Sequence, residues 1–148
     1  MSVSYDVFTE AFLDKVVDYG IVNGLYDSEE LIDRYMKRSI SEFRKSCRYD
    51  LSTTADDTSR AFNVDIPEAD LMEIADIISD GMVVHWLKPY VYKQENLENV
   101  LNTRDFTTYS PSELLFRISG AHKQAQSSFT NKIREYSFNH GDLTTLHL

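Results

Sequence analysis

The sequence has few of the residues that cross-link or interrupt a chain, with one cysteine, three prolines and five glycines in 148 residues. The single cysteine, Cys47, excludes an intrachain disulfide and favours a reducing, cytoplasmic folding environment. No apolar run approaches the roughly 18 residues of a transmembrane helix, so we expect no membrane partner. Near the N-terminus, Asp6 and Glu10 stand where a secretion signal would need basic residues.

Motifs that carry chemistry are also missing from the sequence. It has no glycine-rich phosphate loop, no Gly-x-Ser-x-Gly and no cysteine pair. The histidines do not have the spacing of metal ligands, and His85, beside Trp86 in an apolar segment, is typical of a hydrogen-bonded core histidine. We therefore expect no catalytic residue, no cofactor and no metal, and hence no enzyme. The four histidines are His85, His122, His140 and His147.

Charge is distributed unevenly along this acidic chain, whose net charge is −9. Residues 1–33 hold eight acids and one base, residues 34–48 hold six bases and one acid, and residues 49–86 hold nine acids and one base. Bases near a helix C-terminus are stabilised by the helix dipole, which is one explanation of the basic block. The other is contact with an acidic partner or a phosphate. On that second interpretation the candidate interface residues are Arg34, Lys37, Arg38 and Arg44.

Apolar residues recur at steps of three and four, which predicts a mainly α-helical bundle of about four to five helices in one domain, 1–148. Hydrophobic residues make up 42% of the chain, enough for a core. The first helix is expected over about 5–19. The second opens with Asp27 as its cap and Glu30 three residues later, and starts acidic and ends basic.

The third predicted helix opens at Pro67-Glu68 and is apolar over more than half of its circumference, so it should be central. Gly81 within it permits close packing against another helix. Lys88-Pro89 should end or kink this helix. A short further helix is expected over about 90–101.

The longest predicted helix spans 110–138. Ser110-Pro111-Ser112-Glu113 is a capping-box start with proline at the first helical position. About 28 residues of helix extend for about 40 Å. Its predicted inward face consists of Leu114, Ile118, Ala121, Ala125, Phe129, Ile133 and Tyr136.

Two segments break the helical pattern. Residues 47–66 should form a short extended arm or hairpin containing a polar loop at 50–62, and Phe62, Val64 and Ile66 alternate as in a half-buried strand. Residues 140–148 form an extended C-terminal tail that either packs on its own domain or adds a strand to a neighbouring subunit. The candidate interface residues of this tail are Leu143, Leu146 and Leu148.

Four sequence blocks occur in an order that resembles the neck proteins of tailed bacteriophages. The first is Asp80-Gly81-Met82-Val83-Val84-His85-Trp86-Leu87-Lys88-Pro89. Glu95-Asn96-Leu97 and Asn102-Thr103-Arg104-Asp105-Phe106 follow, and then Tyr109-Ser110-Pro111-Ser112-Glu113-Leu114-Leu115 opens the long helix. The order and spacing of the blocks, over roughly residues 28–146, carry the resemblance.

The resemblance implies a head–tail connector, also called an adaptor or head-completion protein. Such a virion protein is made in the host cytoplasm and assembles at the neck as a ring, of about twelve copies, beneath the portal protein. The ring would extend the DNA channel and dock the next neck or tail protein. An acidic channel repels the duplex, so genomic DNA would pass through without sequence-specific binding.

Two other functions remain open from the sequence. One is another neck or tail component, such as a tail terminator or collar protein. The other is a small cytoplasmic helical regulator that binds a protein partner.

Overall fold

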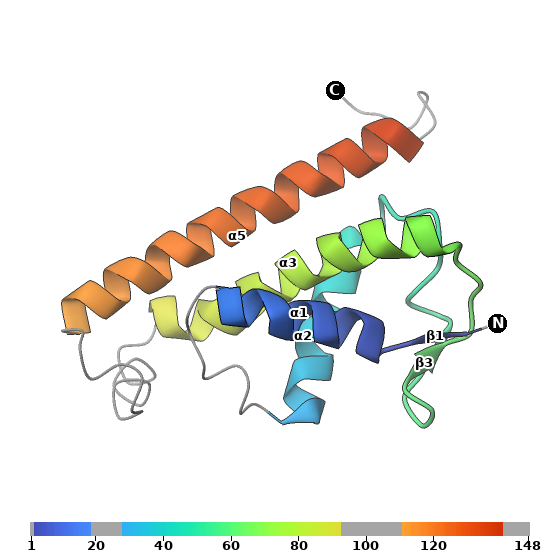
Figure 1. Ribbon diagram of the computed structural model, residues 1–148, viewed down its shortest axis with the longest axis horizontal. Helices are drawn as coiled ribbons and strands as arrows, with labels where there is room; N and C mark the ends of the chain where they lie inside the picture. Colours follow the sequence, from blue (N-terminus) through green and yellow to red (C-terminus); the bar gives the residue numbers. More distant parts are fainter. Residues whose placement is uncertain (1, 19–27, 93–110, 141–148) are drawn as a thin grey trace.

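The computed structural model describes residues 2–18, 28–92 and 111–140, and it confirms a mainly helical fold with a small antiparallel sheet. The long C-terminal helix, α5, is the longest element (Figure 1). The described helices are α1 (Asp6–Asp18), α2 (Glu29–Phe43), α3 (Glu68–Tyr92) and α5 (Pro111–His140). The described strands are β1 (Val3–Ser4), β2 (Ala55–Asp56) and β3 (Ala61–Phe62).

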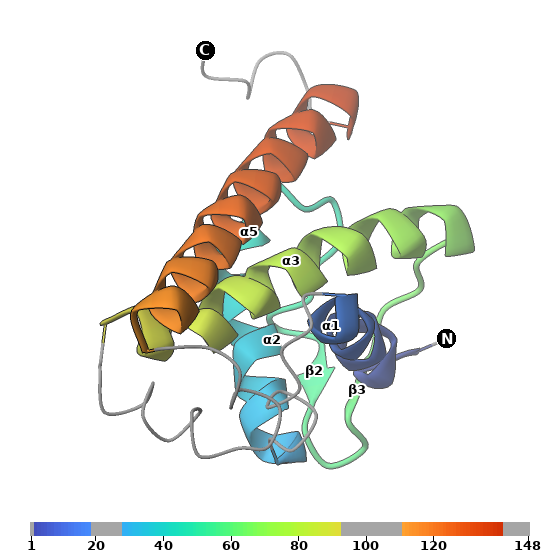
Figure 2. The same ribbon diagram turned by 60° about the vertical axis from the view of Figure 1, so that its left-hand side comes forward.

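Helix α3 is the centre of the fold, as its apolar sequence predicts. Helices α1, α2 and α5 all pack against it, and α1 and α5 lie on different sides of it (Figures 1 and 2). Trp86 of α3 is fully buried, with its ring edge-on to Phe12 of α1 at 5.9 Å between centroids. A helix that is apolar nearly all round must have neighbours on several sides, and α3 has them.

Helix packing is close at Gly81 of α3. A Cβ added there would stand 2.8 Å from two ring carbons of Phe129 of α5, and it would also press on the hydroxyl of Ser39 of α2. That hydroxyl is buried and donates a hydrogen bond of 2.7 Å to the carbonyl of Ile78. The predicted close packing at Gly81 is therefore confirmed, and it joins three helices.

The three strands form one antiparallel sheet in the order β1-β3-β2. β2 and β3 form the predicted hairpin, with Ala55 opposite Phe62 and Asp56 opposite Ala61. Strand β1, which the sequence pattern did not predict, pairs Val3 with Phe62. The predicted strand through Val64 and Ile66 is wrong in extent, because the ladder stops at Phe62; Ile66 is nevertheless buried.

The structure corrects three predicted helix boundaries. Ser28 caps α2, accepting a hydrogen bond from the amide of Leu31, whereas Asp27 lies outside the described residues. The last turn of α2 contains no base, because the basic run straddles the helix end. Pro89 does not end α3, which continues to Tyr92. A proline lacks only its own amide hydrogen, so the residues after it can keep their amide hydrogen bonds and stay helical as far as Tyr92.

Helix α5 confirms the predicted long helix and most of its inward face. Ile118, Ala125, Phe129 and Tyr136 are buried, while Ala121 and Ile133 are half-buried. The edge of the Tyr136 ring meets Phe43 of α2 at 5.0 Å between centroids. The helix predicted over 90–101, apart from its first residues in α3, and most of the 140–148 tail lie outside the described residues.

Candidate interaction surfaces

The basic residues predicted to form an interface are all exposed, although two of them have partners within the chain. Arg34 contacts Glu30 one turn earlier at 3.2 Å, and Lys37 contacts Asp57 of the hairpin at 2.7 Å. Arg38 lies on the same helix, and Arg44 is its C-cap residue. Exposed ion pairs contribute about 0–1 kcal/mol each, so these bases can exchange partners at low cost.

The remaining predicted interface residues cannot be placed. Leu143, Leu146 and Leu148 lie outside the described residues.

A four-charge cluster joins α1, α3 and α5, and sequence reasoning missed it. Lys15 contacts Asp76 and Asp80 at 2.8 and 2.7 Å, and Lys132 contacts the same two carboxylates at 2.8 Å each. Burial alone would raise the pKa of Asp76, but the two ammonium groups lower it. Asp80, 10% exposed, also accepts a hydrogen bond from Ser128 of α5 at 2.8 Å. The cluster therefore fixes α5 on α3.

Arg60 forms a second cluster that sequence reasoning missed. It follows the β2–β3 turn with a φ of 51°, in the left-handed region that non-glycine residues rarely adopt. Its guanidinium contacts Asp33 and Glu29 of α2 and Asp6 of α1, and lies 5.7 Å from the centre of the Tyr5 ring. It thus ties the hairpin to two helices.

One sequence signal could have located both clusters. Lys15 is the one base among the eight acids of residues 1–33, and Arg60 is the one base among the nine acids of residues 49–86. A cation surrounded in sequence by carboxylates has many potential partners, and half-burying it requires several of them at once.

His85 and His122 form a third polar group, where α3 meets α2 and α5. His85 is 9% exposed, and its Nε2 lies 2.7 Å from Oε1 of Glu42, although no well-aligned hydrogen bond joins the two atoms. Burial lowers the pKa of His85, as do Arg38 and Lys88, against the effect of Glu42.

His122 of α5 is in a similar environment. Burial lowers its pKa, as do the charge of Lys88 and the neighbouring His85. Its Nε2 is buried without a hydrogen-bond partner in the part of the chain that the structure describes. Both side chains are therefore held in the neutral form more strongly than in an unfolded chain.

Cys47, the one thiol, is half-buried, and that burial raises its pKa. The thiolate is the reactive form, so this environment disfavours reactivity at Cys47.

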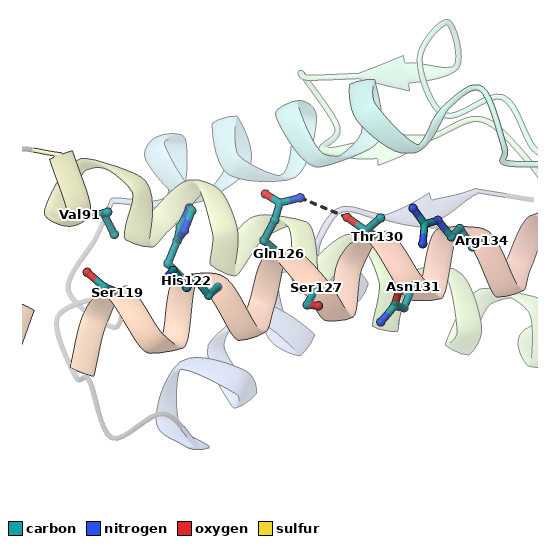
Figure 3. Close-up of a pocket in the computed structure, with 9 residues that line it drawn as sticks. Val91, Ser119, His122, Gln126, Ser127, Thr130, Asn131 and Arg134 are labelled. Atoms are coloured by element: carbon teal, nitrogen blue, oxygen red, sulfur yellow. Dashed lines mark hydrogen bonds between the residues drawn. The ribbon is translucent and has the colours of Figure 1, made fainter. Parts of the chain in front are cut away.

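A groove of about 710 Å³ runs along α5, from Val91 at the end of α3 to Arg134 (Figure 3). Its lining is polar or basic apart from Val91, and none of the described lining residues is acidic. We call this surface the α5 groove. The α5 residues that line it are Ser119, His122, Lys123, Gln126, Ser127, Thr130, Asn131 and Arg134.

Comparisons of the chain with protein-family models, with curated proteins and with solved structures gave no match. Of the helices in the described ranges, none combines the length and the apolar character needed to span a bilayer. Within the same ranges, no group of three or more histidine, cysteine, aspartate or glutamate side chains is placed to hold a metal ion.

Proposed function

We propose that this chain is a virion structural protein of a tailed bacteriophage, a head–tail connector that assembles as a ring below the portal and extends the DNA channel. The observation that carries the proposal is the ordered series of sequence blocks that begins at Gly81-Met82-Val83 and ends at Ser110-Pro111. Its partners would be further copies of itself, the portal protein, the next neck or tail protein, and DNA in transit.

The positions of two of these blocks agree with a structural role. The first forms the second half of α3, including Gly81, where three helices meet. The last opens α5 at Pro111, and α5 packs on that same half of α3 through Phe129. These blocks set how α5 packs on α3. They therefore determine which surface of the protein faces its neighbours.

Charge also favours this proposal over a nucleic-acid-binding protein. The chain has a net charge of −9, and phosphate binding normally requires a basic face. A connector needs DNA to slide rather than adhere, and a negative wall favours sliding. A tail terminator, a collar protein or a small protein-binding regulator remains the alternative.

Locating the chain in particles would test the proposal. Intact virions should contain it in several copies at the neck, visible as density between portal and tail, and its deletion should leave filled heads that carry no tails. Particles that lack the chain, or that assemble normally without it, would contradict the proposal. A regulator would instead be found in infected cells and be absent from purified virions.

The C-terminal tail offers a second test. A chain truncated after Asn139 should melt at the same temperature as the full chain yet incorporate poorly into particles, if Leu143, Leu146 and Leu148 contact a neighbour. Normal incorporation of the truncated chain would show that these leucines do not contact a neighbour.

A further inference from the structure

The outer face of α5 is basic and has an exposed aromatic residue near each end. Phe116 and Phe138 are 81% and 73% exposed. They are 22 residues apart, which is about 33 Å along the helix and close to a whole number of turns, so both point to the same side. Lys123 and Arg134 lie between them on the α5 groove. This face is opposite the buried stripe through Ala125 and Phe129.

The two cations of the α5 groove have no ion-pair partner in the described part of the chain. Five other described bases contact a carboxylate of their own chain, namely Lys15, Arg34, Lys37, Arg60 and Lys132. The other described bases without such a contact in the same ranges are Arg38, Arg44, Lys45 and Arg48, on or just after α2, and Lys88 of α3. In a protein with nine more acids than bases, two unpaired cations on one helix face are a surface for an external carboxylate.

Unpaired carboxylates lie on the outer face of α1. Glu10 and Asp14 are exposed, one helical turn apart, and within the described residues neither has an ion-pair partner. Helices α1 and α5 lie on different sides of α3 (Figure 2), and among the ion pairs of the described residues none joins Glu10 or Asp14 to Lys123 or Arg134. Both surfaces are therefore available to a second copy of the chain.

We propose that the α5 groove docks the acidic outer face of α1 from a second copy of this chain. The proposal rests on the connector function and identifies a contact within its ring. Helix α1 has 13 residues, about 20 Å in length, and so fits between Phe116 and Phe138. Two different surfaces meet in this contact, which is the heterologous arrangement that closes rings.

A nucleic-acid duplex would also be attracted to Lys123 and Arg134. Two observations favour the protein partner. The two exposed phenylalanines gain more from burial against another protein than from a phosphate backbone. The net charge of −9 opposes the long-range approach of DNA, whereas a second copy brings both an acidic and a basic surface.

Charge exchange between the two faces tests the contact. We would prepare the full chain as K123E/R134E and as E10K/D14K, and measure self-association at low salt by sedimentation up to millimolar concentration. Each variant alone should associate at least tenfold more weakly than the unaltered chain. An equimolar mixture should regain association, because each variant offers the surface that the other requires. K45E/R48E makes the same change of charge as K123E/R134E, at exposed positions after α2. It is the matched control for that variant and should associate normally.

The outcomes separate this contact from the proposed function. The contact is overturned if the unaltered chain stays monomeric at millimolar concentration, if either variant associates normally, or if the mixture does not recover. If the unaltered chain binds duplex DNA and K123E/R134E does not, the partner of the α5 groove is nucleic acid and not a second copy of the chain. If the contact fails but the chain is found at the neck of virions, the connector function still stands. If the chain is absent from the neck, the connector function fails, even if the chain associates with itself in solution.

Discussion

Gly81 of α3 lies against the ring of Phe129 of α5 so closely that a single added methyl group would overlap it, at 2.8 Å from two ring carbons. The same methyl group would displace the buried hydroxyl of Ser39. Neither neighbour is free to move, because Phe129 is 2% exposed and Ser39 donates its hydrogen bond to Ile78. The contact therefore sets the distances from α3 to α2 and to α5.

Gly81→Ala should lower the free energy of unfolding by about 1–2 kcal/mol, as overpacking outweighs the gain in helix propensity. Gly120→Ala on α5 is the matched control. A Cβ there meets nothing within 4 Å, so this substitution should stabilise by about 0.5–1 kcal/mol. Urea unfolding followed by circular dichroism measures both changes. Equal stabilisation by the two substitutions would show that the helices separate easily at Gly81.

Asp80 connects the four-charge cluster and is its most buried member, at 10% exposed. Asp80→Ala removes the acceptor for Lys15, Lys132 and Ser128 together, so we expect a loss of about 2 kcal/mol of unfolding free energy. Glu30→Ala, which breaks an exposed pair, should change stability by less than about 0.5 kcal/mol. If the two substitutions have equal effects in urea unfolding, the cluster is only a set of surface pairs.

Stability should fall as the pH drops below the ordinary titration range of histidine. The pKa values of His85 and His122 are lowered in the folded chain, so the unfolded chain binds protons first. The stability contributed by the two neutral rings is therefore complete above about pH 6.5, the unfolded pKa, and is lost as the pH falls from there through the lower folded values. His85→Asn/His122→Asn should flatten this dependence.

The measurement is urea unfolding at several pH values between 7.5 and 5.5. The quantity compared is the slope of the unfolding free energy against pH, rather than its absolute value. A slope is informative even if the double substitution destabilises the fold at every pH. The facing groups Glu42, Arg38 and Lys88 remain in both proteins, so the difference between the slopes belongs to the two histidines. An unchanged slope would assign the pH dependence to other groups.

The elements with strong periodicity could be predicted from sequence, since an apolar stripe such as the one through Ile118 and Phe129 has one way to be buried. The hairpin was predicted in place, but strand β1 was not, because two residues carry no pattern and Val3 becomes a strand only through pairing with Phe62. Pro89 misled because the residues after a proline can still continue the helix, and Tyr90 and Val91 pack against the core.

The candidate surfaces were harder to predict than the elements. The sequence indicates that Arg34 and Lys37 are basic and exposed, but Asp57, which contacts Lys37, comes from a hairpin whose position depends on the whole fold. The α5 groove likewise depends on the whole fold. Helical spacing already places Lys123 and Arg134 on one side of the long helix, but only the packing on α3 shows that this side is exposed.

Reversing the exposed bases of α2 should distinguish an interface from a solvated helix. In R34E/K37E/R38E the exposed pairs with Glu30 and Asp57 are lost and like charges meet, which should lower the unfolding free energy by about 1 kcal/mol. If the block binds an acidic neighbour, incorporation into particles should fall much further, by at least tenfold. K45E/R48E, which follows the helix, reverses two bases instead of three and provides the control for an added negative charge of the same sign. Because salt screens exposed charges, the assay belongs at low ionic strength. Normal incorporation under those conditions would show that α2 is solvated there and would leave the α5 groove as the basic surface available to a neighbour.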